Sequence, residues 1–138
     1  MKLKNYENIK LVIFDCDGVL IDSETISVDV MAQEYLKIDI NIDSQYVRDN
    51  FVGLSYTKVK KHIYDKFDIT LAENFEMDYR KELLETFKKE LKAVSGIEFV
   101  LENLNVPKCV ATSSSMYRAT SSLKIASLYD YFKKDIFS

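Results

Sequence analysis

Residues 9–24 read IKLVIFDCDGVLIDSE, and this stretch decides the fold. Residues 9–14 form a short run of branched and aromatic side chains, long enough for a strand buried on both faces and too short for a helix. Asp15, Asp17 and Gly18 end the run. We therefore expect a buried strand whose carboxyl end carries two carboxylates.

A long helical block follows this strand. Apolar residues recur at three- and four-residue steps from Asp22 to about Lys37, and Asp22 or Ser23 can cap the first turn. Further helices are predicted at roughly residues 44–51, 55–67 and 73–91. This block is too large for one crossover between two strands.

Two more short strands are predicted after the helical block, at residues 109–112 and 135–137. A short amphipathic helix follows Gly96, and another begins near Met116. Strands separated by helices favour parallel pairing through right-handed crossovers. We predict an α/β fold with an incomplete three-strand parallel core (residues 1–17 and 93–138) and an inserted helical cap domain (residues 18–92).

The composition restricts the classes of protein to be considered. A length of 138 residues with 47% hydrophobic and 30% charged residues is typical of one globular unit or two small lobes. The net charge of -3 gives no general attraction to phosphate backbones, so we expect no nucleic-acid partner. Two cysteines and one histidine, His62, are too few for a disulfide framework or a structural zinc site. We expect His62 to be a surface or packing residue, and we expect a cytoplasmic protein with no signal peptide and no membrane association.

The acidic pair after the first strand carries the strongest chemical signal. Ligands gather at the carboxyl ends of strands in α/β sheets. Asp15 and Asp17 lie two residues apart on an extended chain and point the same way, so a divalent metal beside them would balance their charge. Oxygen ligands favour magnesium. One carboxylate can then attack the phosphorus of a phosphate ester while the other handles the leaving-group proton.

Other interpretations of the pair explain less. Two acids separated by one residue also occur in many turns. An EF-hand loop starting at Asp15 fails, because its sixth position is Leu20 and its twelfth is Ile26. Helix capping explains Asp22 but leaves Asp15 and Asp17 without a role.

Two other catalytic classes lack their motifs. A cysteine phosphatase needs arginine six residues after the cysteine, but Asp22 follows Cys16 and Ser115 follows Cys109 at that distance. Neither the nucleotide-binding loop G-x-x-x-x-G-K-[ST] nor the dinucleotide motif G-x-G-x-x-G occurs in the sequence.

The strand followed by DCDGVLIDSE, residues 15–24, and a helical insert resembles motif I of the haloacid dehalogenase-like hydrolases. The resemblance is to the branch of the beta-phosphoglucomutases and sugar-phosphate phosphatases, phosphogluconate phosphatases included. Residues 109–115, CVATSSS, look like the second motif, a hydrophobic strand ending in threonine or serine. The resemblance covers nearly the whole chain and implies a Rossmannoid core and a Mg2+ cofactor.

The resemblance also implies a role for each matching residue. Asp15 would be the nucleophile that becomes an aspartyl phosphate, and a magnesium ligand. Asp17 would be the general acid and then base, with its backbone carbonyl on the metal. Gly18, Thr112 and Ser113 would bind the phosphate, beside a helix N-terminus that favours anions. An N-cap cluster is the alternative interpretation of Thr112 and the serines.

In this family the insert closes over the active site and selects the substrate. Residues 52–56, VGLSY, resemble the cap loop that reaches toward the substrate, which makes Gly53 and Tyr56 candidate substrate contacts. Phosphoglucomutases have arginine where this chain has Tyr56, which argues against a mutase. A tyrosine at this position can equally pack in the cap core.

The chain departs from the family pattern near its last residue. After the third strand, relatives continue with a lysine that neutralises the phosphoaspartate and with a fourth strand that carries acidic metal ligands. Lys133 and Lys134 precede the third strand, so neither is a convincing substitute for that lysine. We expect residues 11–14 to form an exposed edge that favours self-association or a complementing chain. Three explanations for the missing lysine and fourth strand stay open: a fragment, a natural truncation, or a half that another chain or self-association completes.

These inferences predict a magnesium-dependent phosphatase. It would act on a small phosphorylated metabolite of the sugar phosphate type through an aspartyl-phosphate intermediate, with weak or no activity in these 138 residues. A beta-phosphoglucomutase-like phosphotransferase is one alternative. A non-catalytic fragment that acts as an interaction or assembly module is the other.

Overall fold

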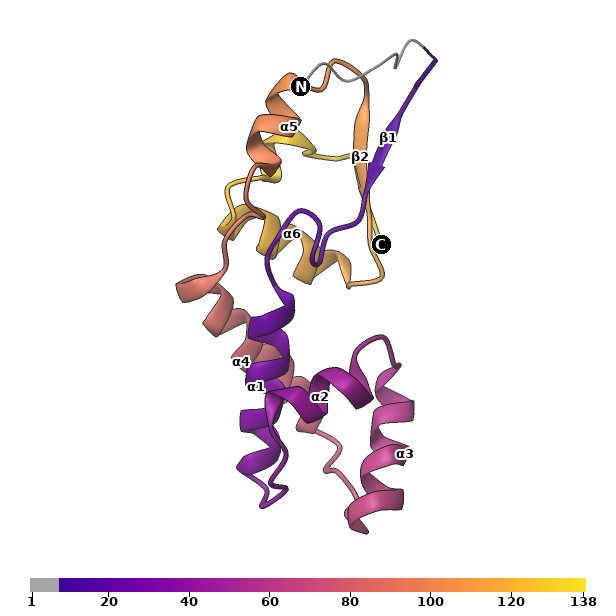
Figure 1. Ribbon diagram of the computed structural model, residues 1–138, viewed down its shortest axis with the longest axis vertical. Coiled ribbons are helices and arrows are strands. Elements are labelled where there is room, and N and C mark those ends of the chain that lie inside the picture. Colours follow the sequence, from indigo (N-terminus) through magenta and orange to yellow (C-terminus); the bar gives the residue numbers. More distant parts are fainter. Residues whose placement is uncertain (1–7) are drawn as a thin grey trace. The chain divides into compact units, whose positions relative to one another are not determined.

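The structure is a computed structural model that describes residues 8–138, which divide into two compact units (Figure 1). The first, the sheet unit, contains residues 8–23 and 91–138, and the second, the helical unit, contains residues 24–90. The sheet unit comprises β1 (Val12–Phe14), α5 (Ile97–Asn103), β2 (Lys108–Ala111), α6 (Met116–Ile125), the 3-10 helix η1 (Tyr129–Tyr131) and β3 (Ile136–Phe137). The helical unit comprises α1 (Glu24–Leu36), α2 (Ser44–Phe51), α3 (Tyr56–Phe67) and α4 (Phe75–Glu90).

The sheet unit contains a parallel sheet with the strand order β1-β2-β3. Val12 pairs with Lys108 and Phe14 with Val110, and Val110 pairs on its other side with Ile136. Helices lie between successive strands in the sequence, as parallel crossovers require. This arrangement confirms the predicted α/β fold with a three-strand Rossmannoid sheet.

The first strand is shorter than the sequence predicts. It begins at Val12 rather than at residue 9, and the Val12 amide donates a hydrogen bond to the carbonyl of Pro107, 3.0 Å away. Pro107 has no N–H, so it cannot supply the donor that would continue the ladder toward residue 9. The residue at which β1 begins is therefore set by the segment that it pairs with.

The expectation that this strand is buried on both faces is wrong. Phe14 is half-buried and its ring meets that of Phe132 edge-on, with 5.9 Å between centroids. Ile13 points to the opposite face and is 62% exposed, and Leu11 is 47% exposed. The reason is that no element of the described sheet unit covers that face, so β1 presents an apolar surface as well as an edge.

The helical unit has its own hydrophobic core. Tyr35 is completely buried and its ring stacks on that of Phe75, with 5.0 Å between centroids. Asp43 caps α2 by accepting a hydrogen bond from the Tyr46 amide at 2.7 Å. His62 is a packing residue, because its Nε2 lies 2.7 Å from the Tyr46 hydroxyl and its ring meets Phe51 edge-on. Among the described residues, every helix is too short or too polar to cross a bilayer.

We expect Ile13→Lys to reduce self-association of the purified chain. Ile13 is 62% exposed on an edge strand, and a charge there disfavours pairing between copies. The measurement is light-scattering mass against protein concentration. Wild type should exceed the monomer mass of 16.0 kDa as concentration rises, whereas Ile13→Lys should stay near it. Met77→Lys, at a 66% exposed position of the helical unit, is the control, and equal masses for wild type and Ile13→Lys would contradict the prediction.

Candidate active site

A tight turn follows β1 and holds the acidic pair at the carboxyl end of the strand. The Cys16 carbonyl accepts hydrogen bonds from the amides of three following residues, the shortest of them from Leu20 at 2.9 Å. The Gly18 amide donates to the Ile21 carbonyl at 2.8 Å, and Gly18 has φ +72°, a conformation that side chains with a Cβ disfavour. Leu20 and Ile21 are buried and anchor the turn in the sheet unit. Gly18 thus has a conformational role, and its predicted contact with phosphate stays a prediction.

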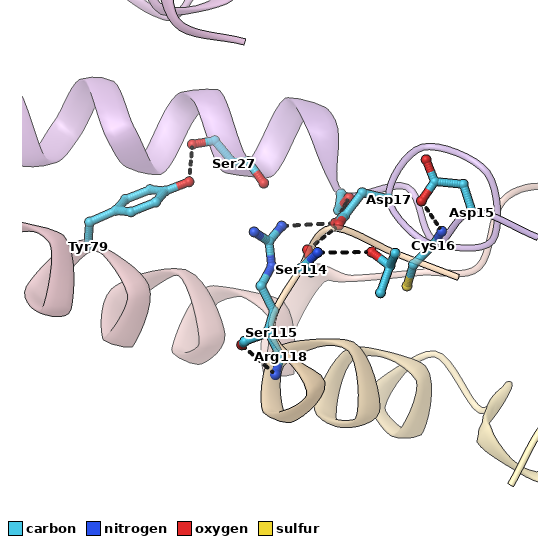
Figure 2. Close-up of polar contacts among 10 residues, drawn as sticks. Asp15, Cys16, Asp17, Ser27, Tyr79, Ser114, Ser115 and Arg118 are labelled. Carbon is cyan, nitrogen blue, oxygen red and sulfur yellow. Dashed lines mark hydrogen bonds and ion pairs between the residues drawn. The ribbon is translucent and has the colours of Figure 1, made fainter. Parts of the chain in front are cut away.

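The two carboxylates of the turn have different surroundings. Asp15 is exposed, and its Oδ1 accepts a hydrogen bond from the Cys16 amide at 2.7 Å. Asp17 has a side chain only 29% exposed, and three donor groups hold its carboxylate (Figure 2). Asp15 is therefore accessible to a ligand, whereas Asp17 is held in one orientation.

The donors to Asp17 come from separate segments of the sheet unit. Ser23 Oγ donates to Oδ1 at 2.7 Å, and Ser114 Oγ donates to Oδ2 at 2.7 Å. Arg118, in the first turn of α6, lies with Nη2 2.9 Å from Oδ1 and forms an ion pair. Because a carboxylate accepts hydrogen bonds at both oxygens, this set of donors matches its geometry and its charge.

The residues after β2 lie at the same edge of the sheet as the acidic turn. The Thr112 amide donates to the Phe137 carbonyl at 3.0 Å, and its Oγ1 accepts from the Ser114 amide at 3.1 Å. Ser115 is the N-cap of α6, since its Oγ accepts from the Arg118 amide at 3.3 Å. The capping role considered for the whole serine cluster thus falls on Ser115, while Ser113 is exposed.

The structure adds residues that sequence reasoning missed. The sequence predicts a helix-capping role for Ser23 and places Ser114 only in a motif, but both donate hydrogen bonds to Asp17. Arg118 carried one signal in the sequence, because it falls in the first turn of a helix, where the macrodipole disfavours a cation unless an acid lies nearby.

The proposed substrate contacts belong to the helical unit. Gly53 lies between α2 and α3 with φ +81°, and a Cβ built there would meet nothing within 4 Å. Tyr56 is the first residue of α3, and its ring packs against the hydrophobic core of that unit.

Cys16 is unsuited to nucleophilic chemistry. Its side chain is 1% exposed, and burial raises the pKa of the thiol to about 12, with the charges of Asp17 and Asp15 adding to the effect and Arg118 opposing it. The thiol therefore stays protonated at neutral pH, and the reactive thiolate is absent.

The turn after β1 offers oxygen atoms, which are the type of ligand that magnesium prefers. Among residues 8–138, no cluster of three or more histidine, cysteine, aspartate or glutamate side chains could hold a metal. The Asp17 carboxylate is occupied by its three donors, so the ligands that this turn offers are the Asp15 carboxylate and the Asp17 backbone carbonyl. Magnesium keeps several waters and needs only one or two protein carboxylates beside a phosphate, so such a donor set fits it.

Comparisons with known proteins agree with this geometry. A model of the haloacid dehalogenase-like hydrolase family matches residues 12–137. The chain is 29% identical over 131 residues to the 6-phosphogluconate phosphatase of Escherichia coli strain K12, a match that covers 94% of this chain and 59% of that protein.

Solved structures show the same fold. A haloacid dehalogenase-like protein of unknown function from Agrobacterium tumefaciens matches with a TM-score of 0.82 and 28% identity, over 94% of this chain and 59% of that one. A HAD family hydrolase from Deinococcus radiodurans, solved with bound phosphate and sodium, matches with a TM-score of 0.75 and 22% identity, over 94% and 58%. The chain thus spans less than two thirds of the length of these relatives. From the parallel sheet, the acidic turn after β1 and the match over residues 12–137, we conclude that this chain belongs to the haloacid dehalogenase-like hydrolases.

Proposed function

We propose that the site is that of a magnesium-dependent phosphatase that forms an aspartyl phosphate on Asp15. The observation that carries the proposal is the contrast between an exposed Asp15 and a held Asp17 two residues away. A nucleophile must be accessible to phosphorus, whereas a general acid and base must keep its orientation. The two environments support these two roles.

The proposed reaction has two steps. Asp17 enters the first step as the protonated acid; a carboxylate oxygen of Asp15 attacks phosphorus, the bond to the leaving oxygen breaks, and Asp17 gives that oxygen its proton. In the second step Asp17 takes a proton from water as the water attacks the aspartyl phosphate, which releases phosphate and restores both side chains. Magnesium, when bound, would supply positive charge beside the anionic reactants.

We assign phosphate binding to Gly18, Thr112 and Ser113. Parallel pairing of β1 with β2 supports the assignment, because it places the ends of both strands at one edge. Thr112 and Ser113 also lie just before the N-terminus of α6, where free amides and the helix dipole favour an anion.

The proposed substrate is a small phosphorylated metabolite of the sugar phosphate type. The support is the similarity to a protein named 6-phosphogluconate phosphatase, which is 29% identical to this chain. We propose that these 138 residues hydrolyse such a compound slowly or not at all, because the lysine and the fourth-strand acidic ligands that the family resemblance implies are not among them. A cytoplasmic setting fits the two free, buried cysteines.

We expect Asp15→Asn to remove the activity. Any phosphate release from 6-phosphogluconate that wild type shows with magnesium should fall to the background level, because an amide cannot form the aspartyl phosphate. A second measurement does not need turnover: fluorine NMR should show a magnesium-dependent beryllofluoride adduct in wild type and none in Asp15→Asn. Asp130→Asn, an exposed position of the same unit, is the control. Activity or adduct that survives in Asp15→Asn, or the lack of both in wild type, would refute the proposal.

We expect Cys16 to resist alkylation in the folded chain. With the pKa of its thiol raised to about 12, almost no thiolate exists at pH 8, and the side chain is 1% exposed. The measurement is mass spectrometry after iodoacetamide treatment, with the urea-unfolded chain as the control. Fast labelling of native Cys16 would contradict the prediction.

We propose that Gly53 and Tyr56 take part in substrate selection. Tyr56→Phe keeps the ring that packs in the helical unit and removes the hydroxyl, which is buried in this structure and has to become exposed to reach the substrate. The Kd of 6-phosphogluconate, measured by calorimetry on the inactive Asp15→Asn chain, should rise about 2- to 10-fold, as the loss of one hydrogen bond predicts. An unchanged Kd would leave Tyr56 as a packing residue only.

A further inference from the structure

We propose that Arg118 is a positioning residue that holds the carboxylate of Asp17 in the orientation needed for proton transfer. This inference rests on the proposed function, in which Asp17 gives a proton to the leaving oxygen and takes one from water. Arg118 acts through Asp17 and is not itself assigned a proton or a bond to substrate.

The first support is the ion pair itself. Arg118 Nη2 lies 2.9 Å from Asp17 Oδ1, within the range of a charge-assisted hydrogen bond. The two side chains are 26% and 29% exposed, so water screens this pair less than it screens a pair on the open surface. The surface pair between Lys61 and Asp65, for comparison, has side chains 73% and 53% exposed. The Arg118 contact is thus built into the sheet unit.

The second support is how the donors share the two oxygens of Asp17. Ser114 fixes Oδ2, while Ser23 and Arg118 converge on Oδ1. Serine hydroxyls rotate freely about their C–O bonds, whereas the guanidinium is planar and always charged. Arg118 is therefore the donor that supplies both charge and a defined direction.

The third support is the place of Arg118 in its helix. It lies in the first turn of α6, after the N-cap Ser115, where the dipole of the helix is unfavourable for a cation. The carboxylate of Asp17 offsets this effect, since it is an anion at the same end of the helix. An arginine in this position is thus explained by its partner on the loop after β1.

The direction of approach separates a positioning role from a phosphate-binding role. In the view of Figure 2, the guanidinium of Arg118 reaches Asp17 from one side, and Asp15 lies on the other. The contact that fixes the guanidinium is with the carboxylate of Asp17, which is the proposed acid and base.

The test compares Arg118→Gln and Arg118→Lys with Lys124→Gln. Glutamine keeps hydrogen-bonding capacity and removes the charge, and lysine restores the charge without the planar fork. Lys124 is the matched control, because it lies on the same helix and its ammonium packs over the Tyr129 ring at 4.9 Å. All variants are made in the full 138-residue chain.

The first readout needs no turnover. Carbon NMR of the side-chain carboxyl of Asp17, assigned with Asp17→Asn, should show a displaced resonance in Arg118→Gln, a smaller displacement in Arg118→Lys and the wild-type position in Lys124→Gln. An unchanged resonance in Arg118→Gln would overturn the proposal, whether or not wild type releases phosphate.

The second readout is kinetic and uses two leaving groups. Arg118→Gln should lower kcat for 6-phosphogluconate about 10-fold with KM within about twofold, because only part of the acid–base contribution is lost. The initial burst of nitrophenol from 4-nitrophenyl phosphate should stay near wild type, since this leaving group needs little help from an acid. In an Asp17→Asn background, Arg118→Gln should cause no further loss.

A rise in KM with unchanged kcat would make Arg118 a substrate ligand and overturn the positioning role. An equal loss in the nitrophenol burst would do the same. Failure of the proposed function is recognised separately, as the absence of both phosphate release and beryllofluoride adduct in wild type, and in that case the resonance of Asp17 still decides whether Arg118 holds it.

Discussion

The parallel pairing of β1 with β2 is the constraint on which the rest of the sheet unit depends. It sets Phe14 opposite Val110, so the turn after one strand and the serine-rich loop after the other leave the sheet at the same edge. Every contact of Asp17 with Ser114 and Arg118 follows from that register. A slip of one residue would turn each side chain of β1 to the other face and separate these partners.

The cluster around Asp17 then connects distant parts of the chain. Ser23 is the last residue of the segment before α1, Ser114 precedes α6, and Arg118 lies in the first turn of α6. The Asp17 carboxylate therefore contacts the residue before α1, the loop after β2 and the first turn of α6. Asp15 stays exposed on the same turn, so a single short loop presents one accessible carboxylate and one restrained carboxylate.

Local patterns explain why so much of the fold could be predicted. The bounds of α2 agree with the predicted helix over residues 44–51, because its N-cap Asp43 and its apolar spacing are both local features. The length and burial of β1 could not be predicted in the same way. They depend on Pro107, which stops the ladder, and on the uncovered face beside Ile13.

The sequence by itself determined the order of strands and helices, the acidic pair Asp15 and Asp17, and the family to which they point. Those features depend on residues that are close together in the chain. Only the tertiary structure decided that Arg118, 101 residues away, pairs with Asp17 and that Cys16 is buried and protonated. Such contacts exist only after the two strands pair, because neither burial nor a charge partner is defined for a residue until distant segments meet.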